Sequence, residues 1–232
     1  MISLDKRLIV ALDVPTSEDA KALVQQLEPD VRHFKVGLQL FLAAGFEIID
    51  WLTGRGHEVM LDLKFFDIPA TVAQAVTQVR DRGVNLVTVH GNDSILRAAA
   101  EAKGNAKILG VTVLTSLDQG DVEDLGFACN IEDIVLSRAR RALELGCDGV
   151  VSSGLEAPRL RAHLDNKLLI VMPGVRPLTN RPDDDQKRVV TPSVAFQNGA
   201  SYIVVGRPVR NAASPGDAAR AILAEISFSL PS

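Results

Sequence analysis

Eight short apolar runs divide the chain into repeated strand and helix units. The runs are rich in Val, Ile and Leu and are bounded by turn residues, which is typical of parallel strands buried on both faces. They occupy residues 8–14, 33–38, 58–65, 86–91, 107–115, 149–154, 168–175 and 202–207. Eight such units in unbroken succession predict an α/β fold, a closed (β/α)8 TIM barrel.

The segments between the runs carry helix start and stop signals. Residues 16–28 open on Thr16 or Ser17 as N-cap and have acids in the first turn. Residues 68–83 have Pro near the start and Gly at the end, and residues 131–146 also end on Gly. A doubly wound dinucleotide fold is the alternative, but no G-x-G-x-x-G follows the first run. We therefore expect one barrel domain over residues 1–232.

Composition limits the partners that we expect. The 232 residues are 47% hydrophobic and carry a formal net charge of −4, so neither nucleic acid nor an anionic membrane is expected to bind. No apolar run approaches the ~20 residues of a membrane span. The N-terminal residues do not read as a signal peptide. Cys129 and Cys147 lack metal-ligand spacing and are interpreted as reduced thiols. These features predict a cytoplasmic protein.

The segment "LDLKFFDIPA" places Asp62, Lys64 and Asp67 in an otherwise apolar run. Burying an isolated charge is expensive, and a buried Asp or Lys is rare unless it is paired. Strand alternation puts Asp62 and Lys64 on one face, and Asp67 follows the strand. The three charges therefore form either a structural ion-pair cluster or a catalytic site.

Two further charges join this set in the predicted barrel. Asp13 ends the first run, and Lys35 lies in the second. Active sites of (β/α)8 barrels lie at the carboxyl ends of the strands. We therefore expect Asp13, Lys35, Asp62 and Lys64 to converge on the barrel mouth.

Two other interpretations of these charges remain open. One is a buried salt-bridge lattice, although such lattices contribute less stability than apolar packing. The other is a metal site on Asp62 and Asp67, although the lysines would compete with a cation for the same carboxylates. We expect no metal and no cofactor. Flanking acids favour protonated Lys64, which can donate a proton or stabilise a carbanion but cannot act as a nucleophilic amine.

The last two runs end in sequences suited to binding phosphate. "MPGVRPL" contains Arg176, and "VVGRPV" contains Gly206 and Arg207. Loops after strands seven and eight of such barrels frequently bind phosphate, and arginine forms bidentate bonds with it. The long segment 176–192 between them is predicted to be a lid, in which Gln186 could donate an amide hydrogen bond to the phosphate.

Three uncharged or weakly basic residues complete the candidates. Thr115 and Ser116 follow the fifth run and could complete a polar ring at the mouth. His90 ends the fourth run. We interpret His90 as a hydrogen-bonded neighbour of the site rather than as a catalyst.

The ordered motifs resemble those of the orotidine 5′-phosphate decarboxylases. Asp62, Lys64 and Asp67 fit the D-x-K-x-x-D signature of that family, which a wider group of phosphosugar barrels shares. The other matching blocks, in the same order, are "ALDVP", "KVGLQLF", "GVTVLTS", "PGVRP", "DDQKRVVTP" and "YIVVGRP". The resemblance implies decarboxylation of orotidine 5′-monophosphate (OMP) to uridine 5′-monophosphate (UMP), the last step of de novo pyrimidine synthesis, without metal or cofactor.

The resemblance also implies roles for the charged residues. It makes Lys64 the donor of a proton to pyrimidine C6 and puts Asp62 beside the substrate carboxylate. Asp13 and Lys35 would hold the ribose and complete the charge array.

Other residues would bind the rest of the substrate or reach a second subunit. Asp67 and Thr71 would reach into the neighbouring subunit's site, which implies a homodimer. The remaining binding residues would be Thr115 and Ser116 near the pyrimidine, and Arg176, Gln186, Gly206 and Arg207 near the phosphate.

Related barrels offer rival functions. Magnesium-dependent ketogulonate phosphate decarboxylases and hexulose phosphate synthases are similar through the third strand but carry an acid on strand two, where this chain has Lys35. A non-enzymatic phosphosugar-binding barrel is a further alternative. Phe66 and Ala70 depart from the "KFHDIPNT" common in the family, which puts local detail around the array in doubt but not the activity.

Overall fold

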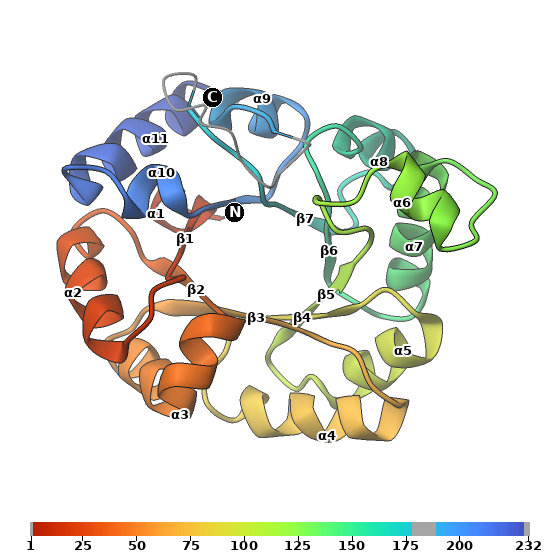
Figure 1. The fold of residues 1–232 in the computed structure, drawn as a ribbon, viewed down its shortest axis with the longest axis horizontal. Coiled ribbons are helices and arrows are strands. Elements are labelled where there is room, and N and C mark those ends of the chain that lie inside the picture. The colour runs from red at the N-terminus through yellow and green to blue at the C-terminus, as the bar shows by residue number, and fades with distance from the viewer. Residues whose placement is uncertain (1, 178–188, 230–232) are drawn as a thin grey trace.

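Eight parallel strands close into a barrel in the order β1-β2-β3-β4-β5-β6-β7-β8 (Figure 1). The structure is a computed structural model that describes residues 2–177 and 189–229. The strands are β1 (Leu8–Ala11), β2 (His33–Gly37), β3 (Glu58–Phe65), β4 (Leu86–His90), β5 (Lys107–Val111), β6 (Gly149–Val151), β7 (Leu169–Met172) and β8 (Tyr202–Val205). Each begins within or at the start of a predicted run, so the predicted (β/α)8 barrel is confirmed.

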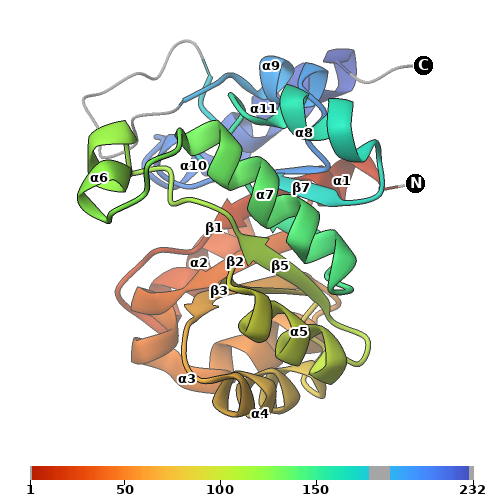
Figure 2. The same cartoon turned by 90° about the vertical axis from the view of Figure 1, so that its right-hand side faces the viewer.

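Helices surround this ring of strands. They are α1 (Leu4–Arg7), α2 (Ser17–Leu27), α3 (Leu38–Gly54), α4 (Pro69–Arg80), α5 (Asp93–Ala102), α6 (Gln119–Asp124), α7 (Ile131–Glu144), α8 (Ala157–Leu164), α9 (Pro192–Gln197), α10 (Arg207–Arg210) and α11 (Pro215–Ser229). Figure 1 shows helices around the whole ring, and in Figure 2 α4 and α5 lie at one edge of the molecule and α9 and α11 at the opposite edge. Within the described residues, no helix is long and apolar enough to cross a membrane.

Local sequence signals explain where the predicted helices begin and end. Thr16 caps α2, because its hydroxyl accepts a hydrogen bond of 3.1 Å from the Asp19 backbone N–H. Pro69 occupies the first turn of α4, where its missing N–H costs nothing. Gly83 and Gly146 follow α4 and α7 with φ of 75° and 84°, a conformation that glycine adopts without strain.

Several strands end earlier than their apolar runs. β5 ends at Val111 although the run extends to residue 115, and β6 and β7 end at Val151 and Met172. The predicted boundaries were wrong at these carboxyl ends, because an apolar run continues into the loop that covers the barrel mouth. Hydrophobicity alone does not separate a strand from such a loop.

The core has two layers, one inside the barrel and one between strands and helices. The buried side chains that fill the interior are Ile9, Ala11, Met60, Leu86, Leu109, Val171, Tyr202 and Val204. A larger apolar cluster lies between the outer face of the sheet and the helices. Ile9 and Ala11 on β1 and Met60 on β3 point inward, so Asp13 and Asp62, which follow them at spacing two, leave the same inner face at the mouth.

Candidate active site

A bulge near the end of β3 determines where the signature side chains lie. Leu61 pairs with Val87 of β4, and Phe65 pairs with Val89, so β3 advances four residues where β4 advances two. Within this bulge Lys64 has a φ of 49°, in the left-handed region that a non-glycine residue rarely adopts. Such a conformation costs roughly 1–3 kcal/mol and is concentrated at functional sites.

The bulge modifies the predicted side-chain alternation. In a regular strand, alternation alone would place Asp62 and Lys64 on one face. Here the backbone is irregular between Leu61 and Phe65. Both side chains nevertheless reach the same cavity. The prediction that they face one site is therefore correct, but the backbone geometry behind it was not foreseen.

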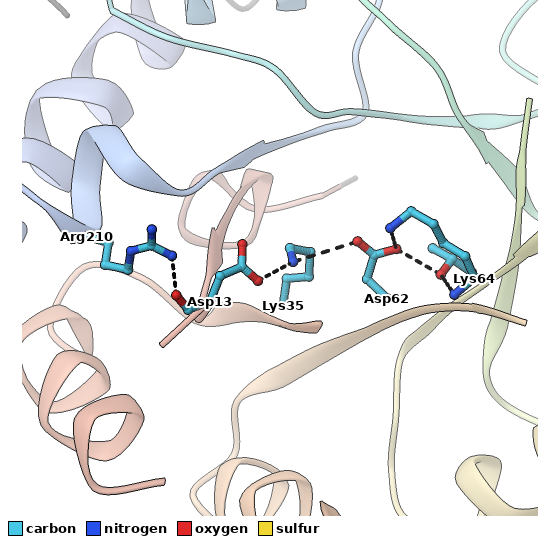
Figure 3. A network of polar contacts seen from close by, with 6 residues as sticks. Asp13, Lys35, Asp62, Lys64 and Arg210 are labelled. Carbon is cyan, nitrogen blue, oxygen red and sulfur yellow. Dashed lines mark hydrogen bonds and ion pairs between the residues drawn. The ribbon is translucent and has the colours of Figure 1, made fainter. Parts of the chain in front are cut away.

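Four charged side chains form a continuous chain across the mouth (Figure 3). Lys64 Nζ donates to Asp62 Oδ1 at 2.9 Å, and Asp62 Oδ2 lies 3.7 Å from Lys35 Nζ. Lys35 Nζ then donates to Asp13 Oδ1 at 2.8 Å. Acid and base alternate along the chain, so each charge has an opposite neighbour and its burial is compensated.

Asp62 is ionised in this setting. Its side chain is 13% exposed, and burial alone would raise its pKa. The charges of Lys35 and Lys64, with hydrogen bonds from Lys64 and Thr88, outweigh that effect and hold the pKa of Asp62 below its ordinary value. The carboxylate therefore remains negative at neutral pH and faces the cavity between two ammonium groups.

Gly37 leaves room for the ion pair between β1 and β2. A Cβ atom at this position would lie 2.9 Å from both Asp13 Oδ1 and Lys35 Nζ, closer than real Cβ contacts allow. The side chains of Asp13 and Lys35 thus occupy the space in which a Cβ would lie, so a larger residue here would displace them. Gly37 is a site-forming residue that we did not predict.

A cavity of about 460 Å³ opens at the carboxyl ends of the strands. Eight of the predicted site residues line it, namely Asp13, Lys35, Asp62, Lys64, Thr115, Arg176, Gly206 and Arg207. Its volume lies in the range of small-molecule sites, and apolar side chains such as Val113 and Val204 form part of its wall. An ordered charge array beside an apolar wall suits a ligand with both a charged and an apolar part.

The side of the cavity nearest β7 and β8 is basic. Arg176 is buried, Arg207 begins α10, and Arg210 lies one turn further on. Arg210 also donates a hydrogen bond to the backbone carbonyl of Asp13, which links α10 to the charge array. Three guanidinium groups beside one cavity favour a doubly negative group such as a phosphate monoester.

The two ends of the predicted lid lie side by side. Val175 and Val190 form a parallel bridge, and the Arg176 N–H donates to the Val190 carbonyl at 2.9 Å. The described ends of this segment therefore meet beside Val175 and Arg176, which line the cavity. Gln186 lies outside the described residues.

The remaining predicted residues do not line the cavity. Ser116 is exposed, one residue beyond Thr115. Asp67 and Thr71 are also exposed at the start of α4, where Asp67 Oδ1 accepts a bond of 2.6 Å from the Ile68 N–H. His90 is partly buried, and its ring lies 4.4 Å from that of Phe66. Burial, followed by the charges of Arg138 and Lys64, lowers the pKa of His90, so it is neutral at neutral pH.

The described part of the chain contains no group of three or more His, Cys, Asp or Glu side chains arranged to hold a metal ion. The carboxylates at the mouth already have ammonium partners: Asp13 and Asp62 both contact Lys35. The donor set of this site therefore does not resemble an oxygen-ligand metal site.

Fold and site together define a (β/α)8-barrel enzyme with an arginine-lined mouth and an alternating acid–base array. The family model described as the orotidine 5′-phosphate decarboxylase / HUMPS family matches residues 6–222. The chain belongs to this family.

Similar proteins carry the same name over almost the whole chain. An orotidine 5′-phosphate decarboxylase of Methylococcus capsulatus is 58% identical over 97% of this chain and 93% of its own length. One from Nitrobacter winogradskyi is 50% identical over 97% of this chain and 94% of its own length. A crystal structure of orotidine 5′-phosphate decarboxylase from Lactobacillus acidophilus superposes with a TM-score of 0.84 at 34% identity, covering 95% of this chain and 99% of its own. These relatives are carboxy-lyases.

Sequence reasoning missed four residues of the site. Gly37, Gln39, Thr88 and Arg210 line the cavity or contact the array, yet none was predicted. Thr88 could have been found, because it shares the inward parity of Leu86 and is polar in an apolar run. Arg210 could have been found from its spacing of three from Arg207 on a helix.

Proposed function

We propose that this protein decarboxylates OMP to UMP without a metal ion or organic cofactor, with Lys64 as proton donor. The observation that carries the proposal is the array at the mouth, in which Asp62 lies 2.9 Å from Lys64 Nζ and 3.7 Å from Lys35 Nζ. The names of the relatives give the substrate class.

The reaction needs a cation where negative charge develops. When the bond between C6 and the carboxylate breaks, its electron pair stays on C6 as a vinyl carbanion, and CO2 leaves. The Lys64 ammonium can stabilise that carbanion and then transfer its proton to C6, which completes UMP and leaves a neutral amine for reprotonation by water. Asp62 keeps Lys64 in place, and its negative charge opposes the substrate carboxylate but not the departing neutral CO2.

A single lysine cannot supply the whole acceleration. One ion pair at about 4 Å is worth roughly 4 kcal/mol at an effective dielectric of ~20, whereas enzymes lower barriers by about 8–23 kcal/mol. We assign the remainder to preorganised charges and to binding energy at the phosphate, where Arg176 and Arg207 line the cavity. Closure of segment 176–192, with Gln186 donating to the phosphate, would use that binding energy to order the site.

The direct test follows the ultraviolet absorbance of OMP after addition of purified protein. We expect conversion to UMP, and full activity after exhaustive EDTA treatment. Activity that EDTA abolishes and magnesium restores would contradict the metal-free mechanism and favour a magnesium-dependent relative. Binding of OMP without turnover would favour a phosphosugar-binding barrel.

The phosphate assignment has its own test. Arg207→Ala should lower kcat/KM for OMP at least about 10-fold, because a charge-assisted bond to the phosphate is lost. The matched control is Arg159→Ala, which removes an exposed arginine paired with Asp133 on α7. Equal kcat/KM values in the two variants would remove Arg207 from the phosphate site.

We further propose a homodimer whose subunits exchange Asp67 and Thr71. Exposed apolar side chains adjoin these residues, with Ile68 67% and Phe66 65% exposed, and Leu38 and Leu42 are exposed on α3. Exposed apolar side chains next to Asp67, with others on α3, suit a self-complementary interface.

Mixed dimers distinguish exchange from action within one subunit. Lys64→Ala and Asp67→Ala homodimers should each be inactive, but each mixed dimer contains one site with both residues intact. Random reassortment should therefore restore about a quarter of the wild-type activity. If Asp67 acts in its own subunit, the mixture stays inactive.

A cytoplasmic location fits the thiol chemistry. Cys129 is exposed and Cys147 is buried, and both are free in the structure. Reduced cysteines are usual in a reducing compartment. Cell fractionation should recover the activity with cytoplasmic marker enzymes; recovery with the periplasmic or membrane fraction would contradict this location.

A further inference from the structure

Thr88 links the two residues at the centre of the charge array. Its side chain is fully buried, on β4 opposite the bulge of β3. The Lys64 backbone N–H donates to Thr88 Oγ1 at 3.0 Å, and Thr88 Oγ1 lies 2.9 Å from Asp62 Oδ1. One hydroxyl thus contacts the backbone of one array residue and the carboxylate of the other.

The directions of these hydrogen bonds follow from the groups involved. The Lys64 N–H can only donate, so Thr88 Oγ1 accepts there. The ionised Asp62 carboxylate can only accept, so the single hydroxyl proton of Thr88 points to Asp62 Oδ1. The same oxygen accepts from Lys64 Nζ at 2.9 Å. Lys64 is therefore held at both ends, by its backbone through Thr88 and by its ammonium through Asp62.

We propose that Thr88 is a positioning residue that holds Lys64 in its left-handed conformation and fixes the rotamer of Asp62. This inference rests on the proposed role of Lys64. The bulge interrupts the ladder at Lys64, and the hydroxyl provides an acceptor for its N–H there. A left-handed lysine is held only where its surroundings compensate the strain, and Thr88 is the side chain that does so.

The proposal distinguishes orientation from binding. Thr88 does not line the cavity in the described structure, so substrate affinity should depend on it little. A small displacement of a catalytic group, by contrast, lowers the rate strongly. The expected signature is a loss in kcat with KM nearly unchanged.

The test compares three variants by steady-state kinetics with OMP. Thr88→Val keeps the shape but removes the hydroxyl, and it should lower kcat about 10- to 100-fold with KM within about threefold of wild type. Thr88→Ser keeps the hydroxyl and should recover kcat to within about threefold of wild type. Thr112→Val is the control, because Thr112 is equally buried but donates to the Val151 carbonyl at 2.9 Å, away from the array; its kcat should match wild type.

Thermal unfolding of the same variants separates this role from a purely structural one. If Thr88→Val and Thr112→Val lose similar stability but only Thr88→Val loses kcat, the positioning role stands. Wild-type kcat in folded Thr88→Val would overturn it, and so would equal losses in the valine and serine variants. If the wild-type protein did not convert OMP to UMP, or if Lys64→Ala kept wild-type turnover, the proposed function would fail instead. The two failures are therefore distinguishable.

Discussion

The barrel carries a charged cluster at each end, and the two clusters have opposite characters. At the mouth, Lys35 and Asp62 face an open cavity. At the base, the same two strands contribute His33 and Glu58, and Lys6 Nζ lies 2.7 Å from Glu58 Oε1. Both ends contain a lysine–carboxylate pair of nearly equal length. What differs is their setting: the Lys35 and Asp62 side chains are 10% and 13% exposed and line the cavity, whereas the Lys6 and Glu58 side chains are 41% and 24% exposed at the opposite end of the barrel.

The base cluster combines the partly exposed Lys6–Glu58 ion pair with a fully buried histidine, His33. His33 is fully buried, and among the described residues its Nε2 has no hydrogen-bond partner. Burial lowers the pKa of His33 to about 4, against the smaller opposing effect of Glu58. The comparison shows that polarity at a barrel end is not by itself a functional signal. An ionised array that lines an accessible cavity, by contrast, does indicate a functional site.

The largest effect is expected at Lys64. Lys64→Ala removes the proposed proton donor, so kcat for OMP should fall at least about 10³-fold. The fold should remain, because the side chain is partly exposed and Asp62 keeps Lys35 as a partner. Activity and circular dichroism check both parts. Turnover near that of wild type would contradict the proposed mechanism. It would imply that the mouth array has a structural role, like the base cluster.

A smaller loss of activity is expected when charged side chains of the array are displaced than when one of them is removed. Gly37→Ala introduces a Cβ 2.9 Å from Asp13 Oδ1 and Lys35 Nζ, so the pair must move. We expect kcat/KM to fall about 10- to 100-fold, since a 1 Å displacement can cost about that much. Gly54→Ala is the control, because its Cβ would meet no atom within 4 Å. Equal activity of the two variants would show that the geometry of Asp13 and Lys35 is unimportant.

Changes at the base cluster should alter the free energy of unfolding rather than the catalytic rate. His33 has a folded-state pKa of about 4 and an ordinary value of 6.5, so the unfolded state binds more protons between these pH values. The free energy of unfolding should therefore rise with pH from about 4 to 6.5, by at most about 1.4 kcal/mol per pH unit for this one group.

His33→Gln should reduce this slope in urea titrations. A residual slope is expected, because the pKa values of His57 and His90 are also lowered, in both cases chiefly by burial. The kcat of the variant at pH 7 should stay close to wild type. An unchanged slope would mean that His33 does not control the pH dependence of stability. A large loss of kcat would contradict the claim that the base cluster has no part in catalysis.

The sequence was sufficient for the barrel and for most of the array. Eight apolar runs predict eight strands, and the position of Asp13, Lys35 and Asp62 near strand ends predicts their convergence. These are consequences of period-two alternation and of parallel strands ending at one face.

The sequence was insufficient where the geometry departs from regular strands. The left-handed Lys64 and the role of Thr88 depend on a bulge between β3 and β4. No local residue pattern predicts this bulge. The space that Gly37 leaves depends on where the Asp13 and Lys35 side chains meet. Both are properties of register and packing, which pairwise spacing along one chain does not encode.

The most direct test of the account compares the two lysine pairs themselves. Lys35→Met and Lys6→Met each remove one ammonium, from pairs of 2.8 Å and 2.7 Å, and keep most of the side-chain length. Measured with OMP, kcat/KM should fall at least about 100-fold for Lys35→Met and stay within about twofold for Lys6→Met. Lys6→Met should lose no more than about 1 kcal/mol of unfolding free energy, as a partly exposed pair does. Equal losses of kcat/KM, or a larger loss at Lys6, would contradict the claim that the mouth array performs the chemistry.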